Sequence, residues 1–228
     1  MDSYAFISYQ TSDKAVAGQL KEVLASFGIN SFLAHEDIEV SAEWRIKILE
    51  ELKKADLCVC LLSQSYYSSP WCIQESGIAA FRDGMTIIPL SIDGSVPQGF
   101  ISYIQSTKID DKVSLNHLLP GLVKHNAKQA TNEVIKIIGS SKSFRGAEAN
   151  FQLILPYISL LTDEQIMTLL EVSAKNNQVH HAGLCATEYI PPLLKSHGHL
   201  LSTEKRELLE EICNEYLAHK QDWEERHS

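Results

Sequence analysis

The chain has 228 residues, 44% of them hydrophobic and 21% charged, with a formal net charge of −9. This acidic balance argues against general binding to nucleic acid or to anionic membranes, and no apolar stretch approaches the roughly 20 residues that a membrane span needs. The N-terminus shows no basic segment followed by an apolar run, and none of the five cysteines forms a Cys-x-x-Cys pair. We therefore expect a cytoplasmic protein with reduced thiols.

The first half of the chain alternates strand-like and helix-like segments. An uninterrupted apolar run at residues 57–62 predicts a strand that is buried on both faces. Further strands are expected at 4–9, 29–34, 85–90 and 106–109, with Pro89 near the end of its strand. Helices are expected between them, one capped by Ser12 or Asp13 and ended by Gly28, and another ending near Ile138. This alternation predicts a parallel sheet with helices on both faces.

The segment 68–75 is the most informative one for function. Ser69 precedes Pro70, which is the usual arrangement of an N-cap and a first helical residue, so a helix is expected to begin here. Trp71 and Glu75 are four residues apart and would lie on one face of that helix. Because the helix follows a central parallel strand, Glu75 would lie where open α/β sheets bind ligands. It is the leading candidate for a catalytic residue; the alternative is an exposed helix carboxylate.

The second half of the chain is acidic and helical. Residues 139–143 are small, polar and without periodicity, which favours a linker. Thr162 and Gln165 form a capping-box pattern at the start of one helix, and Pro191-Pro192 is expected to break or kink another. The predicted organisation is an α/β domain at 1–139, a linker at 140–148 and a small all-α domain at 149–228.

Other kinds of site have weaker support. Adjacent His180 and His181 diverge on a helix, and His197 and His199 have no carboxylate or cysteine at ligand spacing, so no metal site is expected. Cys72 lies near a helix N-terminus, where a thiol pKa can fall, but no histidine is close in sequence and a buried Cys is favoured. The sequence holds no Gly-x-Ser-x-Gly elbow, no Gly-x-Gly-x-x-Gly and no phosphate-binding Lys-Ser/Thr motif.

Several segments together resemble the Toll/interleukin-1 receptor (TIR) domain family. Residues 5–9 with Asp13 look like its first signature box, and residues 32–44 are similar to its second, with Ser41 in place of the usual Gly. Residues 61–66 and 71–75 resemble the stretch that carries the catalytic Glu in NAD-consuming members, and residues 87–90 match the fourth strand. The resemblance covers about residues 3–138. The intact Trp-Cys-x-x-Glu is closer to bacterial members, of the Thoeris-like kind, than to animal receptor adaptors.

The resemblance implies a flavodoxin-like fold with a five-stranded parallel sheet, and an NAD+ glycohydrolase or cyclase that releases nicotinamide. Glu75 would stabilise the positive charge that develops on the ribose, with NAD+ as substrate and no cofactor or metal. Gln10-Thr11 offers no basic group for the phosphates, unlike members with a basic residue there. The substrate-binding residues that the resemblance implies are Phe6, Ser8, Gln10, Phe32, Asp37, Trp44, Ser68 and Trp71.

The implied partners are NAD+, further copies of the chain and a possible trigger protein, with no nucleic acid or membrane. Self-association would use the 35–43 loop, and the helical domain would act as a sensor or assembly module. The implied biological role is signal production in bacterial antiphage immunity. Two alternatives stay open: a non-catalytic TIR scaffold, and a virulence factor that mimics host TIR domains.

Overall fold

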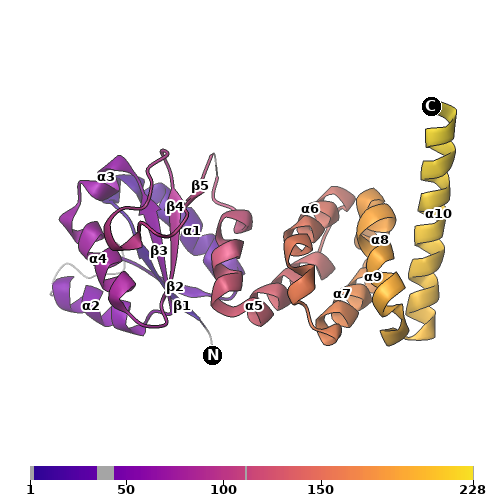
Figure 1. Cartoon of the computed structure of the whole chain (residues 1–228), viewed down its shortest axis with the longest axis horizontal. Coiled ribbons are helices and arrows are strands. Elements are labelled where there is room, and N and C mark those ends of the chain that lie inside the picture. Colours follow the sequence, from indigo (N-terminus) through magenta and orange to yellow (C-terminus); the bar gives the residue numbers. More distant parts are fainter. Residues whose placement is uncertain (1–2, 35–43, 111, 228) are drawn as a thin grey trace. The chain divides into compact units, whose positions relative to one another are not determined.

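The computed structural model describes residues 3–34, 44–110 and 112–227. The chain divides into two compact units, residues 1–125 and 126–228. The first unit is an α/β fold and the second is helical (Figure 1). Among the described residues, no helix is both long enough and apolar enough to cross a lipid bilayer.

The centre of the first unit is a five-stranded sheet in the order β2-β1-β3-β4-β5, with every neighbouring pair parallel. This is the predicted flavodoxin-like sheet. All six residues of β3 are buried, as their apolar run predicts. The strands are β1 (Tyr4–Ser8), β2 (Asn30–Leu33), β3 (Leu57–Leu62), β4 (Thr86–Ser91) and β5 (Thr107–Lys108).

Pro89 lies inside β4, not at its end, where it is paired in register with Cys60 of β3. The short β5 pairs only with Leu90 and Ser91. The sheet therefore has an open position beside Pro89, where a residue without an N–H donor can be accommodated.

Helices cover both faces of the sheet (Figure 1). One face carries a buried cluster that joins the sheet to α2 and α4, and the other face is covered by α1 and the first half of α5. Gly121 of α5 approaches the sheet so closely that an added Cβ would lie 2.5 Å from Ile88. The helical elements are η1 (Thr11–Asp13), α1 (Lys14–Ser26), α2 (Trp44–Lys54), α3 (Gln64–Tyr67), α4 (Pro70–Phe81), η2 (Gly99–Ile101) and α5 (Leu115–Gly139).

Helix α5 belongs to both compact units. Its backbone leaves the helical region at Asn126 (φ −152°, ψ 91°), where the first unit ends. The ring of His125 contacts Ser3 and Thr86 at 3.3 Å each, which ties the first half of α5 to the sheet. The compact α/β unit thus ends before the sequence-predicted boundary at residue 139. Residues 144–148 of the expected linker form the first turns of α6.

The second unit begins with the rest of α5. The predicted capping box is present, because Thr162 and Gln165 bond reciprocally at the start of α7. Pro191 and Pro192 do not break α9; they lie in its first turn, where a missing N–H donor is tolerated, and a π turn directly precedes the helix. The elements are α6 (Phe144–Ile154), η3 (Leu155–Leu160), α7 (Asp163–Lys175), α8 (Asn177–His180), η4 (Cys185–Tyr189), α9 (Ile190–His197), η5 (Gly198–Leu200) and α10 (Thr203–His227).

Candidate active site

Helix α4 begins as the sequence predicts. Ser69 is its N-cap and accepts a hydrogen bond from the backbone N–H of Cys72 at 3.4 Å, with Pro70 in the first turn. The buried face of α4 consists of Cys72, Glu75, Ser76 and Ala79. Trp71 lies at the margin of this face and is 40% exposed, so Glu75 shares its buried environment with Cys72 and not with Trp71.

Glu75 is buried, with 1% of its surface exposed, which corrects the alternative of an exposed helix carboxylate. Ser8, the last residue of β1, donates a hydrogen bond of 2.5 Å to its Oε2. Among the described residues, no group donates to the buried Oε1. Burial raises the pKa of Glu75 to about 7, against the opposing effect of the Ser8 hydrogen bond. The carboxyl group therefore changes charge near neutral pH.

Ser8 also contacts Tyr66 of α3, with 3.1 Å between the two hydroxyl oxygens. The Tyr66 hydroxyl donates to the backbone carbonyl of Cys72 at 3.0 Å. Both side chains are fully buried, so the four groups form one chain of contacts inside the protein. Tyr66 is not among the site residues that the sequence predicts. Its position three residues after the helix cap Ser63 is the only local signal for its orientation toward the sheet.

Phe6 and Phe32 belong to the same buried layer. Phe6 and Ser8 are two residues apart on β1 and so point to one face of the sheet. The rings of Phe6 and Phe32 lie 5.6 Å apart, and both side chains are nearly inaccessible. Cys72 is also buried, and burial raises the pKa of its thiol to about 12, which agrees with a packed Cys and disfavours a nucleophile.

Gln10 and Ser68 lie together beside this layer. They line a cavity of about 420 Å³ with Ser12, Gln64 and Ser65, at the carboxyl ends of β1 and β3. All five of these residues are uncharged and polar. Asp13 is the N-cap residue of α1, as expected, but its side chain makes no capping hydrogen bond. It accepts a hydrogen bond of 2.7 Å from Ser63 and so connects the loops that follow the two strands. The cavity offers hydrogen bonds to a ligand, but its lining supplies no cation for phosphates.

Trp44 and Asp37 are the remaining predicted site residues. Trp44, the first residue of α2 in the described chain, is 41% exposed. Asp37 lies outside the described residues. The structure thus brings Glu75 and Ser8 together, places Phe6 and Phe32 in the adjoining layer, and places Gln10 and Ser68 at a neighbouring cavity.

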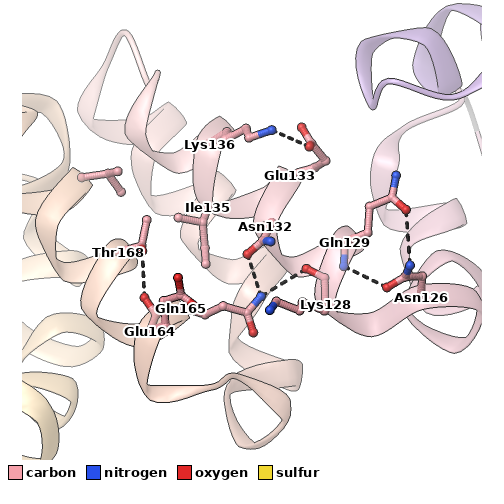
Figure 2. Close-up of a pocket in the computed structure, with 11 residues that line it drawn as sticks. Asn126, Lys128, Gln129, Asn132, Glu133, Ile135, Lys136, Glu164, Gln165 and Thr168 are labelled. Carbon is pink, nitrogen blue, oxygen red and sulfur yellow. Dashed lines mark hydrogen bonds and ion pairs between the residues drawn. The ribbon is translucent and has the colours of Figure 1, made fainter. Parts of the chain in front are cut away.

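The helical unit contains a larger cavity of about 630 Å³, lined by residues of α5 and α7 (Figure 2). Gln165 is one of the lining residues, and its amide nitrogen lies within 3.1 Å of Thr131 Oγ1, Asn132 Oδ1 and the Lys128 carbonyl, so both of its N–H groups have acceptors within the protein. Glu133 and Lys136, which also line the cavity, form an ion pair (Figure 2). Within residues 3–34, 44–110 and 112–227, no three His, Cys, Asp or Glu side chains are grouped to hold a metal ion.

Comparison with known proteins agrees with this architecture. No curated protein matches the chain. A protein-family model described as the TIR domain matches residues 5–119, a segment that contains the parallel sheet, the Ser8–Glu75 contact and all of α4. This family includes NAD-consuming enzymes and non-catalytic scaffolds. Because this match covers half of its length and its sheet has the parallel five-stranded topology, the chain belongs to the TIR domain family.

Proposed function

We propose that the chain is a TIR-domain NAD+ glycohydrolase or cyclase that cleaves the bond between nicotinamide and ribose. The observation that supports this best is Glu75, a buried carboxyl group with a pKa near 7 and an oxygen, Oε1, that receives no hydrogen bond from the described residues. NAD+ is the substrate in this proposal, and no further cofactor is needed.

A purely structural role would not explain Glu75 well. Burying a carboxyl group without satisfying both oxygens opposes folding, and native proteins seldom retain such groups. Glu51 of α2 is a useful comparison, because it is also buried but has three hydrogen-bond donors, Tyr4, Lys47 and Lys54. Glu75 has one donor, Ser8, among the residues that the structure describes. Perturbed carboxyl groups with spare acceptor capacity are typical of active sites.

The chemistry of NAD+ cleavage suits this group. Nicotinamide leaves as a neutral molecule, so the main demand is to stabilise the positive charge that develops at the anomeric carbon. An ionised Glu75 would accept hydrogen bonds from ribose hydroxyls at Oε1 while Ser8 holds Oε2, which fixes the negative charge beside the reacting carbon. A buried site strengthens this attraction because few water molecules screen it.

The buried position of Glu75 also implies a requirement for activation. A substrate reaches Oε1 only after side chains that cover it have moved. TIR domains associate with themselves or with other TIR proteins, so we propose that assembly of several chains opens and completes the site. The polar cavity at Gln10 and Ser68 would then receive the part of NAD+ beyond the reacting ribose.

The direct test is to incubate the purified chain with NAD+ and to separate nicotinamide, ADP-ribose and cyclic products by chromatography. The Glu75→Gln variant should lose about 100-fold or more in rate, the usual effect of removing one preorganised charge-stabilising group. Glu50→Gln is the matched control, because Glu50 is an exposed carboxylate of α2. Nicotinamide release at the wild-type rate by Glu75→Gln would contradict the proposal.

A non-catalytic scaffold is the second candidate, and the exposed aromatic side chains of the first unit favour it. Phe81, Phe100 and Tyr103 are 88%, 81% and 75% exposed, which suits contacts with other proteins. A scaffold would bind partner TIR domains and leave NAD+ intact in every assembly state. The same chromatographic assay, repeated at the highest attainable protein concentration, separates the two candidates.

We further propose a cytoplasmic role in bacterial antiphage signalling, with the helical unit as the sensor of a trigger. The support is the resemblance of the Trp71-Cys72-x-x-Glu75 segment to bacterial NAD-consuming members. Loss of phage protection in cells that carry the Glu75→Gln variant would support this role. Protection that is equal with and without the substitution would contradict it.

A further inference from the structure

Helix α4 buries polar side chains and exposes apolar ones. Glu75 and Ser76 are buried, whereas Ile73 and Phe81 are 49% and 88% exposed. The stripe that carries this exposed pair consists of apolar or small residues at helical spacing: Ile73, Gly77, Ala80 and Phe81. In a helix that packs only against its own sheet, the apolar stripe faces inward. The exposed stripe of α4 therefore indicates contact with another molecule.

The segment after β4 extends this exposed stripe. Ile101 of η2 is buried in the core cluster, and its neighbour Phe100 is 81% exposed. The Phe100 ring lies close to α4, because a Cβ added at Gly77 would be 4.0 Å from its Cδ2. Gly77, Ala80, Phe81 and Phe100 line a hollow of about 200 Å³. We call these four residues, together with Ile73, the α4–η2 face. An apolar cavity of about 150 Å³ can hold benzene, so one aromatic ring fits this hollow.

Packing within the chain does not explain why position 77 is Gly. The Phe100 contact of an added Cβ is at an ordinary van der Waals distance, and Gly77 does not have a positive φ. Gly inside a helix lowers stability relative to Ala. An Ala would therefore fit the fold and stabilise the helix, but its methyl group would occupy part of the hollow. A hollow that receives a side chain of another molecule accounts for the Gly.

The α4–η2 face carries no charged side chain. Residues 70–81 contain one charged residue, the buried Glu75, and residues 94–107 contain none. Arg82, Asp83 and Asp93 lie at the ends of these two segments. The whole chain has a net charge of −9, so two copies repel each other at long range and come together most easily where neither presents charge. A neutral face suits a partner of like charge, whereas a basic partner would be attracted to the acidic parts of the surface.

We propose that the α4–η2 face docks a second copy of the chain, with the Phe81 ring of each copy in the hollow of the other. Phe81 has the largest exposed fraction among the large apolar side chains of the described chain. The face holds both a projecting ring and a hollow, so it is complementary to itself, as a two-fold symmetric interface requires. The face is small, so docking is weak and the chain is a monomer in dilute solution.

Docking itself does not depend on catalysis, but its consequence for catalysis rests on the proposed function. The α4–η2 face and Glu75 belong to the same helix, and Gly77 is two residues after Glu75. A copy docked on α4 therefore acts on the helix that carries the catalytic candidate. In the proposed enzyme, this docking contributes to the assembly that opens the site.

The test is sedimentation velocity of the full chain over the widest attainable range of protein concentration, without NAD+. The wild type should pass from monomer to dimer as the concentration rises. Phe81→Ser should raise the dissociation constant about tenfold or more, the usual effect of removing a central aromatic side chain from an interface. Phe144→Ser is the matched control, because Phe144 is 50% exposed but belongs to the helical unit. It should leave the dissociation constant unchanged.

Gly77→Ala separates docking from stability. It should raise the midpoint of thermal unfolding and yet raise the dissociation constant about fivefold or more, because the added methyl group overfills the docked interface. Gly18→Ala in α1 is the matched control, since an added Cβ there meets no atom within 4 Å. It should raise the thermal midpoint and leave the dissociation constant unchanged.

Two results would overturn the proposal. One is a wild-type chain that stays monomeric at every concentration, whatever other protein the face binds. The other is a dimer whose dissociation constant is the same in the wild type, in Phe81→Ser and in Gly77→Ala. Phe81→Ser changes an exposed side chain, so this comparison does not depend on the folding of Gly77→Ala.

The outcomes for this inference and for the proposed function are separable. A dimer that Phe81→Ser weakens, in a chain that leaves NAD+ intact, would retain the docking face and reject the enzyme. NAD+ cleavage by a chain that never forms a dimer would do the reverse. If both proposals hold, Phe81→Ser should lower NAD+ cleavage per molecule at concentrations where the wild type is a dimer.

Discussion

Replacing Glu75 by Gln is expected to stabilise the first unit at neutral and alkaline pH. The pKa of Glu75 is raised by burial from 4.5 to about 7. Between these values the unfolded chain has released the proton and the folded chain retains it. The free energy of unfolding then falls by about 1.4 kcal/mol per pH unit, and by about 3 kcal/mol over the whole interval. Stability is thus fully present below about pH 4.5 and lost as the pH rises through 7.

The Gln side chain has nearly the same shape as Glu and no charge, so the stability of the variant should not fall between pH 4.5 and 7. Its free energy of unfolding should equal that of the wild type near pH 4.5 and exceed it by about 2–3 kcal/mol near pH 8. Urea unfolding followed by tryptophan fluorescence measures the difference. Trp44, Trp71 and Trp223 are the three tryptophans, so a Trp223→Phe background reports the first unit alone.

Glu50→Gln supplies the control for the loss of an exposed carboxylate from the first unit. Parallel stability curves of Glu75→Gln and the wild type from about pH 4.5 to pH 8 would contradict this prediction. That result would mean that Glu75 is solvated in solution, with an ordinary pKa.

Four further predictions concern other parts of the chain. Burial alone would raise the pKa of Glu51, but hydrogen bonds from Lys47, Tyr4 and Lys54 lower it to about 2. The ionised Glu51 therefore stabilises the fold above pH 4.5, and this stabilisation is lost as the pH falls toward 2. Glu51→Gln should lower the free energy of unfolding by about 1–2 kcal/mol at pH 7, measured by urea unfolding. Dialysis against EDTA should leave NAD+ cleavage unchanged, and a strict requirement for added divalent ion would contradict this. A chain that ends at His125 should remain folded and monomeric by circular dichroism and light scattering, whereas one that ends at Gly139 should aggregate, because it exposes the apolar residues of the second half of α5. NAD+ cleavage per molecule should rise with protein concentration, and Trp44→Ala should suppress the rise; a constant, high activity in a monomer would exclude activation by assembly.

The parts of the fold that follow local rules could be predicted from the sequence. The apolar run of β3 and the Ser69-Pro70 start of α4 depend on residues within one turn or one strand, and both are confirmed. The break of α5 at Asn126 could not be predicted, because helical periodicity continues on both sides of it. Pro191 likewise looks like a helix breaker until the preceding π turn is known.

The candidate site shows the same division. Family resemblance indicates Glu75 and Ser8, but the burial of Glu75 depends on helices and strands distant in sequence. The contact between Ser8 and Tyr66 joins residues 58 positions apart, and no local pattern encodes it. For Trp71 the local rule misleads. Helical spacing predicts that Trp71 shares a face with Glu75, but Trp71 is partly exposed whereas Glu75 is buried.

The five cysteines are all free and buried, three of them in the first unit and two, Cys185 and Cys213, in the second. Burial raises the pKa of Cys185 to about 12 and that of Cys213 to about 11, as it does for Cys72, so these three thiols hold almost no reactive thiolate in the folded chain. Alkylation can then proceed only from transiently opened molecules. The rate at which each of these three thiols gains an alkyl mass therefore measures how often its own unit opens, and Cys72, one turn before Glu75, would report the opening of the candidate site itself.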